Sequence, residues 1–202
     1  MWKFCLYSSL FLIGIFVMTQ EEWAFDTTRY WETENLTISY IVYTYYVIEI
    51  GHYVYATLTI HTEPKQSDFY QMIFHHISTI FLMVFSLAYG YHRIGCTVTL
   101  ITDASDPFLE LAKSVKYNGN QKLADHLFTL FAVVFIVSRM MIYPYAILLP
   151  CFHAPLTLMT VILPCLLWCL QALFALWTFM ILRIAYRLVS GVSVDDTRDQ
   201  DD

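Results

Sequence analysis

The sequence predicts an all-α integral membrane protein, and three observations support this fold class. Hydrophobic residues make up 58% of the 202 residues and aromatic residues 17%, and the mean hydropathy is +0.54. Apolar stretches long enough for about 20 helical residues recur along the chain. Short polar segments containing turn-forming residues separate these stretches. We therefore expect a bundle of six transmembrane helices.

Residues 1–190 are predicted to form one transmembrane domain, followed by an acidic tail at 191–202. The first apolar stretch could be confused with a signal peptide, but Gln20, Glu21 and Glu22 follow it without a small-residue cleavage site. We interpret it as a true span. The predicted spans cover residues 4–19, 36–58, 69–89, 94–115, 126–149 and 156–188.

Basic residues indicate the orientation, because cytosolic loops carry an excess of Lys and Arg. Six spans place both termini on one side, and only Arg29 and Arg93 flank the opposite face. The basic residues on the terminal face are Lys3, Lys65, Lys113, Lys116, Lys122, Arg183, Arg187 and Arg198. Both termini are therefore predicted to be cytosolic. A glycosylation sequon begins at Asn35 and would then face the lumen, in agreement with the charges.

Charge and cysteine content exclude several function classes. The formal net charge is −6, and the chain has no basic stripe interleaved with aromatic residues, so we expect no nucleic-acid partner. The five cysteines form no Cys-x-x-Cys pair, which argues against a disulfide framework or a zinc site. Membrane lipids are the expected surroundings.

Ionisable residues inside the third and fourth spans mark the candidate site. His75 and His76 lie in one span, and Asp103, Asp106 and Glu110 lie in the next. A carboxylate at the centre of a membrane costs about 2.5 to 3.5 kcal/mol on insertion scales, so such residues are functional candidates by default.

The depths of these residues match. The histidines lie six or seven residues into a helix that enters from the cytosol, which is roughly 10 Å of helical rise. Asp106 lies seven residues before Lys113 on a helix that returns to the cytosol. Spacings of three and four place Asp103, Asp106 and Glu110 on one face, and Thr79 shares a face with both histidines. We expect the two polar faces to meet.

A histidine held by a carboxylate can act as a general base, or as a nucleophile in a water-poor cavity. Adjacent histidines point about 100° apart on a helix, so one would be base or nucleophile and the other a donor to an oxyanion. Spacing leaves open which histidine has which role. Arg139 lies in the fifth span and is expected to pair with an acidic residue such as Glu49, or else to bind an anionic ligand group.

Two other interpretations apply to the same residues. The histidines and carboxylates could form purely structural hydrogen bonds between helices. They could instead bind a metal, as in membrane oxygenases with histidine boxes. The seven histidines include no His-x-x-His or His-x-x-x-His pair, so we expect no metal.

The segments FHHISTIFL, YHRIG, DASDPFLELAK and RMMIYP resemble the ceramide synthase (longevity-assurance) motif of the TLC domain, and the resemblance extends over nearly the whole chain. It implies a multi-pass enzyme of the endoplasmic reticulum that transfers a fatty acyl group from acyl-CoA to the amine of a sphingoid base. The family's catalytic set would match His75, His76, Asp103 and Asp106. A luminal hairpin, here near residues 149–158, would influence acyl-chain length. Many members have a histidine where this chain has Thr102.

On this basis we expect a TLC-type bundle or barrel around a central lipid tunnel, with Thr79, Glu110, Arg139 and Glu49 supporting the catalytic residues. Acyl-CoA would be a substrate, and no further cofactor is expected. A homodimer or a heterodimer is left open. The competing hypothesis is a non-catalytic TLC-domain protein that senses lipid or associates with the translocon.

Overall fold

The structure is a computed structural model, and it describes residues 1–24, 26–32, 37–62, 67–152, 154 and 157–189. All regular elements in these ranges are helical. The predicted glycosylation site at Asn35 and the predicted tail at 191–202 lie outside the described residues. The α-helices are α1 (Trp2–Thr19), α2 (Tyr40–Thr59), α3 (Phe69–Ala88), α4 (His92–Asp103), α5 (Asp106–Tyr117), α6 (Gln121–Ile136), α7 (Leu149–Cys151) and α8 (Leu158–Val189).

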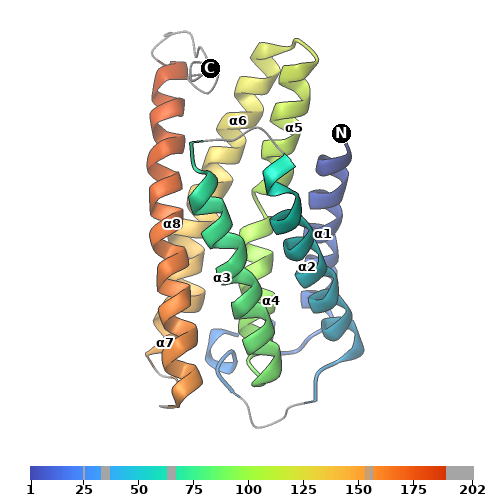
Figure 1. The fold of residues 1–202 in the computed structure, drawn as a ribbon, viewed down its shortest axis with the longest axis vertical. Helices are drawn as coiled ribbons and strands as arrows, with labels where there is room; N and C mark the ends of the chain where they lie inside the picture. Colours follow the sequence, from blue (N-terminus) through green and yellow to red (C-terminus); the bar gives the residue numbers. More distant parts are fainter. Residues whose placement is uncertain (25, 33–36, 63–66, 153, 155–156, 190–202) are drawn as a thin grey trace.

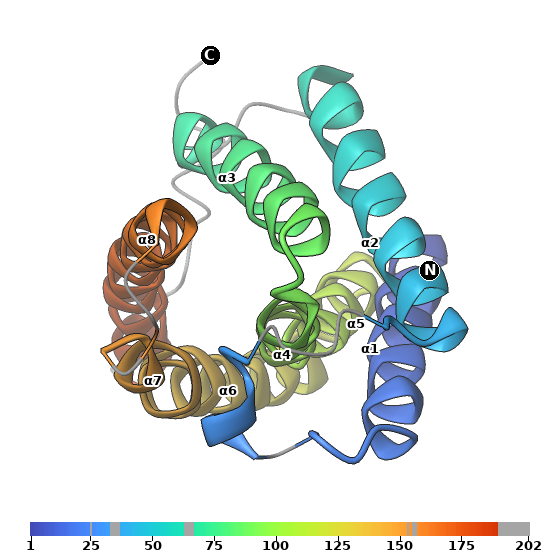
Figure 2. The same cartoon turned by 90° about the horizontal axis from the view of Figure 1, so that it is seen from below.

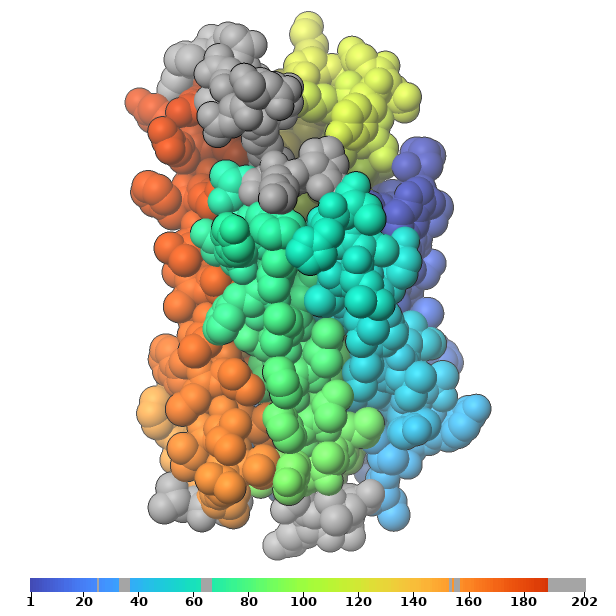
Figure 3. Space-filling view, viewed as in Figure 1, coloured from blue at the N-terminus to red at the C-terminus, as the bar shows by residue number. Residues whose placement is uncertain are grey.

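The long helices run along one axis and close into a ring (Figures 1 and 2). Contacts follow the order α1, α2, α3, α8, α6, α5 and back to α1, and α4 packs inside against α1 and α3. On the face seen in Figure 3, α8, α3 and α2 lie side by side. The first residues of α1 and the last turns of α8 lie at one end, here called the terminal end. The opposite end, with residues 20–24 and 26–32, is the loop end.

Four helical segments are long and apolar enough to cross a membrane: Trp2–Thr19, Phe69–Ala88, Gln121–Cys151 and Leu158–Leu188. The protein is thus a multi-pass membrane protein. The helix α2 is not in this set; it is rich in tyrosine and carries Glu49 and His52. The helices α4 and α5 are 12 residues each, shorter than a span requires. The count of six spans stays a prediction.

The prediction of one continuous helix over residues 94–115 is wrong. The chain turns at Ala104 and Ser105, and α5 starts afresh at Asp106 with Pro107 in its first turn. Proline has no backbone N–H and its ring clashes with the carbonyl four residues earlier, so it is tolerated at a helix start but not in its interior. Figure 1 shows that α4 and α5 nevertheless follow one another along the bundle.

Close packing between α2 and α4 depends on a glycine. A Cβ atom added at Gly95 would lie 1.8 Å from the Tyr46 hydroxyl oxygen. That hydroxyl donates to the carbonyl of His92 at 2.9 Å and lies 3.0 Å from Ser86 Oγ. One buried tyrosine therefore ties α2 to both α3 and α4. The turn between α3 and α4 contains Gly90 with a φ of 81°, a left-handed conformation that favours glycine.

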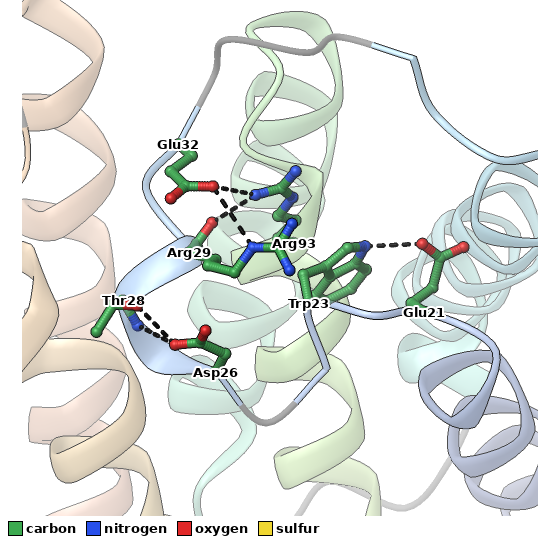
Figure 4. A network of polar contacts seen from close by, with 7 residues as sticks. All are labelled: Glu21, Trp23, Asp26, Thr28, Arg29, Glu32 and Arg93. Atoms are coloured by element: carbon green, nitrogen blue, oxygen red, sulfur yellow. Dashed lines mark hydrogen bonds and ion pairs between the residues drawn. The ribbon is translucent and has the colours of Figure 1, made fainter.

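At the loop end, a polar network holds the segment after α1 against α4 (Figure 4). The Arg93 guanidinium donates to the carbonyl of Arg29 at 2.8 Å and forms an ion pair with Glu32 at 2.9 Å. The indole N–H of Trp23 donates to Glu21 at 2.8 Å. These contacts place Trp23 and Tyr30 among the buried core residues.

The fifth predicted span continues past α6 in wider turns. Two π-helical segments, Val137–Ile142 and Pro144–Leu148, lead into α7. A π-helical turn inserts an extra residue, changes which side chains face inward, and occurs frequently at functional sites. Arg139 lies in the first of these segments and is buried.

Candidate functional site

A cavity of about 310 Å³ lies inside the ring of helices. His75 and His76 from α3, Asp103 at the end of α4 and Asp106 at the start of α5 all line it. The sequence analysis predicted that these four residues would lie together, and they do. The cavity extends toward the terminal end, where Trp2, Lys3, Ile60, Lys113 and Ile184 contribute to its wall.

The wall of the cavity is mostly apolar below and around the ionisable groups. Phe174, which is fully buried, lies behind His75, and Tyr143 packs edge-on against Phe174 with ring centroids 5.3 Å apart. Toward the terminal end, aliphatic and aromatic side chains line the space. They include Leu6, Met72, Leu109, Phe128, Phe131 and Ile181. An elongated apolar ligand could bury its surface in such a cavity.

Aromatic rings surround the two histidines. The ring of Tyr53 lies edge-on to both, at centroid distances of 6.0 Å from His75 and 5.9 Å from His76. The indole of Trp177 lies nearly perpendicular to His75 at 5.4 Å. Such edge-to-face contacts restrict the tilt of an imidazole without taking up its nitrogen atoms.

The hydrogen bonding of His75 differs from the expectation. Its Nδ1 atom is buried and has no hydrogen-bond partner in the described part of the chain. We expected a carboxylate to hold one of the two histidines; at His75, aromatic rings pack around the imidazole and Nδ1 contacts no carboxylate. A buried unpaired nitrogen costs free energy, and such groups are often retained where a ligand or substrate completes the bonding.

Arg139 joins three elements at the site. Its guanidinium donates to Asp106 at 2.9 Å and also to the backbone carbonyl of Thr102. That carbonyl loses its helical partner where α4 ends, so the arginine caps the break between α4 and α5. The guanidinium carbon lies 4.3 Å from the ring centroid of Phe135 and 5.3 Å from that of Phe174. Arg139 therefore fixes the carboxylate of Asp106 beside the cavity.

The predicted ion pair between Arg139 and an acidic residue is confirmed, but the acid differs from the example named. We expected an acidic residue such as Glu49, whereas the observed carboxylate is Asp106. Glu49 is fully buried on α2, close to Asp103, and does not line the cavity. The sequence spacing could not resolve this, because the two acids lie on different helices and only the packing decides which one faces Arg139.

The remaining predicted support residues divide between two places. Glu110 lines the cavity and pairs with Lys113 at 2.7 Å. Thr79 is buried but lines a separate small space of about 20 Å³ next to Met83 and Thr99, away from the main cavity. The four-residue spacing between His75 and Thr79 predicted that they share a helix face, but the main cavity does not reach Thr79.

The residues of the cavity wall that sequence reasoning missed include Tyr53, Asp68 and Trp177. The N–H of Trp177 donates to the carboxylate of Asp68 at 3.1 Å, linking α8 to the start of α3. An aspartate just before a helix usually indicates an N-cap, so the sequence pointed to a capping role for Asp68 and not to a place in the cavity wall. No local pattern distinguishes Trp177 from the other aromatic residues of α8.

The sequence predicts that these residues bind no metal. In the described ranges, no group of three or more His, Cys, Asp or Glu side chains is arranged to hold a metal ion. The side chains that line the cavity include imidazoles, carboxyl groups, one guanidinium and the ammonium groups of Lys3 and Lys113.

The chain matches known proteins over nearly its full length. A family model described as the TLC domain matches residues 1–183. Ceramide synthase hyl-1 of Caenorhabditis elegans is 32% identical over 98% of this chain and 58% of the relative. Human ceramide synthase 5 is 34% identical over 98% of this chain and 53% of the relative. Alternaria stem canker resistance protein 1 of Solanum lycopersicum is 32% identical over 98% of this chain and 71% of the relative.

The chain spans about half the length of most of these relatives, and the region that it shares with them contains the helices that line the cavity. The family match covers all four predicted catalytic residues. This chain belongs to the ceramide synthase family of TLC-domain proteins.

Proposed function

We propose that this protein is an acyl-CoA-dependent N-acyltransferase that joins a fatty acyl group to the amine of a sphingoid base such as sphinganine, giving a ceramide or dihydroceramide. The observation that carries the proposal is the convergence of His75, His76, Asp103 and Asp106 on one membrane-embedded cavity. The names of the relatives support the reaction class, since several are ceramide synthases.

In the proposed reaction, an imidazole removes a proton from the amine while the amine nitrogen attacks the thioester carbon. The carbonyl oxygen becomes an oxyanion, the C–S bond breaks, and the coenzyme A sulfur takes up the proton. The thioester is a reactive electrophile, so the protein mainly has to orient the amine and stabilise charge. His75 or His76 would act as the base, and the other would donate to the oxyanion.

The carboxylates would act electrostatically. Asp106 is held by Arg139, and Asp103 lies deeper, 4% exposed. A carboxylate near an imidazole stabilises the imidazolium that forms when the base takes a proton. The low dielectric of the cavity strengthens these interactions relative to water.

Two routes are compatible with this arrangement. The amine can attack the thioester directly, or a histidine nitrogen can first take the acyl group, release coenzyme A and then transfer the acyl group to the amine. The unused Nδ1 of His75 favours neither route. Rapid quenching after mixing with acyl-CoA alone, followed by mass analysis of peptides, distinguishes them. A mass increase equal to the acyl group on His75 or His76 requires the two-step route, and unmodified peptides contradict it.

We further propose that the terminal end faces the cytosol in the endoplasmic reticulum membrane. Six lysines and arginines among the described residues lie near that end: Lys3, Lys113, Lys116, Lys122, Arg183 and Arg187. The cavity would then open toward the compartment that contains acyl-CoA. Removal of N-glycans should increase the gel mobility of the wild type but not of Asn35→Gln. Cleavage of a tag at the N-terminus by protease added to intact microsomes tests the same orientation.

The activity test uses purified protein in lipid nanodiscs with acyl-CoA and sphinganine, and it detects the amide by mass spectrometry. We expect amide and free coenzyme A in equal amounts from the wild type. Metal analysis of the same preparation tests the oxygenase interpretation. A folded wild type that forms no amide across a range of acyl-chain lengths contradicts the proposal and favours a non-catalytic TLC-domain protein.

A further inference from the structure

Asp68 occupies the N-cap position of α3 but does not cap the helix. Aspartate at this position usually accepts a hydrogen bond from a backbone N–H of the first turn. Here no side-chain cap bond forms. The carboxylate instead accepts the indole N–H of Trp177 at 3.1 Å and lines the cavity near the terminal end.

The charge environment of Asp68 also differs from that of the ion-paired carboxylates of the cavity, while Asp103 lies deeper and is only 4% exposed. Asp106 is paired with Arg139, and Glu110 is paired with Lys113. Asp68 forms no ion pair with a described residue. A carboxylate of this kind can bind a cation supplied by a ligand.

Trp177 connects Asp68 with the histidines. Its indole N–H contacts Asp68, and its ring lies 5.4 Å from the ring of His75. His75 follows Asp68 by seven residues, which is about 10 Å of helical rise. The tryptophan therefore bridges the space between the cavity entrance and the imidazole.

We propose that Asp68 and Trp177 form an entrance subsite for the protonated amine of a long-chain amine, here the sphingoid base. This inference deepens the proposed function and rests on it for the identity of the substrate. The carboxylate binds the ammonium group through charge-assisted hydrogen bonds, and the indole face adds a cation–π contact. The hydrocarbon chain lies along the apolar wall of the cavity.

The subsite gives the amine a path to the base. The amine of a sphingoid base is mostly protonated near neutral pH and cannot attack a thioester until it loses a proton. Binding at Asp68 brings the ammonium into the cavity with its charge balanced. Moving past Trp177 then places it next to His75, where the imidazole takes this first proton and passes it to water at the cavity entrance. The second proton leaves the amine during acyl transfer and ends on the coenzyme A sulfur. Asp68 contributes to substrate binding and not to the acyl transfer itself.

The kinetic test is the Asp68→Asn variant, which keeps the shape of the side chain and removes its charge. We expect the KM for sphinganine to rise about 10- to 100-fold, the range for loss of a hydrogen bond to a charged group. The KM for acyl-CoA should stay within about twofold of the wild-type value, because the thioester group is uncharged and forms no ion pair with the carboxylate. Asp68→Glu should restore part of the sphinganine affinity.

Asp125→Asn is the matched control, because Asp125 lies on α6 outside the cavity and accepts a hydrogen bond from Gln121. It should leave both KM values unchanged. An unchanged KM for sphinganine in Asp68→Asn overturns the inference, as does an equal rise in both KM values. Trp177→Phe keeps an aromatic ring beside His75 and removes the N–H, so it should raise the KM for sphinganine less than Asp68→Asn does.

A binding measurement on wild-type protein separates this inference from the proposed function. Dodecylamine, which is protonated near neutral pH, and dodecanol have the same chain length, and only the first is charged and can donate N–H hydrogen bonds. We expect the cation to displace radiolabelled sphinganine at a concentration at least about tenfold lower than the alcohol needs, and Asp68→Asn to abolish that preference. If the wild type forms no amide but shows this Asp68-dependent preference, the proposed function fails and the amine subsite stands. Equal displacement by both compounds overturns the subsite.

Discussion

Two arginine–carboxylate pairs in this protein have the same N–O distance of 2.9 Å but lie in different surroundings. Arg93 and Glu32 meet at the loop end, where the glutamate side chain is 51% exposed. Arg139 and Asp106 meet inside the bundle, where the exposed fractions are 9% and 27%. Figure 4 shows that the first pair belongs to a network of loop residues. The second pair lies beside the histidines of the cavity.

The difference shows that distance alone does not determine what a pair contributes. Water screens the charges of the loop-end pair, so this pair adds little stability. Its role is to hold the loop against α4. Asp26 in the same loop accepts hydrogen bonds from Thr28, which lower the pKa of its carboxyl group. The inner pair is costly to desolvate and costly to break.

The largest expected effect is the difference in kcat/KM between a variant of a cavity histidine and a variant of a loop-end histidine. Under the proposed function, His75→Ala should lower kcat/KM by about 100- to 10,000-fold, the usual contribution of an acid–base residue. His92→Ala should change kcat/KM by less than about threefold, since the ring of His92 packs against Trp23 outside the cavity. Steady-state amide formation measures both. Equal losses in the two variants would contradict the separation.

The next effect concerns the inner ion pair. Arg139→Gln leaves Asp106 without its cation and the Thr102 carbonyl without its donor, so we expect a loss of about 3 to 5 kcal/mol in the free energy of unfolding. Amide formation should fall as well, because Asp106 is no longer fixed. Thermal unfolding in detergent and activity below the unfolding midpoint test the two parts. A variant as stable and as active as wild type would show that the pair is dispensable.

A smaller change in the free energy of unfolding is expected where a substitution disturbs only packing. Gly95→Ala forces a Cβ atom toward the Tyr46 hydroxyl and should cost about 1 to 3 kcal/mol, the range for overpacking. Gly51→Ala is the control, since no atom lies within 4 Å of a Cβ at that position. The KM values should stay near those of wild type in both variants. Equal stability of the two proteins would mean that α2 and α4 can separate freely.

The smallest effect is expected at the loop end. Arg93→Gln should reduce the free energy of unfolding by less than about 1 kcal/mol, because Glu32 is half exposed and can be hydrated instead. The effect should shrink further in high salt, which screens exposed charges. Unfolding midpoints at low and high salt provide the measurement. A loss as large as that of Arg139→Gln would remove the contrast between the two pairs.

The sequence predicted the position of the site better than its contacts. Helical rise placed His75 and Asp106 at matching depth, because depth depends only on counting residues from the membrane boundary. The break before Pro107 could have been predicted from the proline itself, but the helical spacing of Asp103, Asp106 and Glu110 suggested a single helix. The choice of Asp106 over Glu49 as the partner of Arg139, and the contact of Trp177 with Asp68, depend on how distant helices pack. Local spacing carries no information on those contacts.

The family resemblance is confirmed by the match of the TLC domain to residues 1–183. The roles of individual side chains and the path of the lipid remain predictions. Each of these predictions can be tested separately, because different residues form the cavity entrance, the inner ion pair and the surroundings of the histidines.

The most direct test compares amide formation by Asp106→Asn and Glu32→Gln, two variants that each replace one carboxylate of an arginine pair with an uncharged side chain of similar size. At temperatures where both are folded, we expect Asp106→Asn to lose at least about 100-fold in kcat/KM and Glu32→Gln to stay within about twofold of wild type. Comparable activities of the two variants would contradict the assignment of the chemistry to the buried cavity.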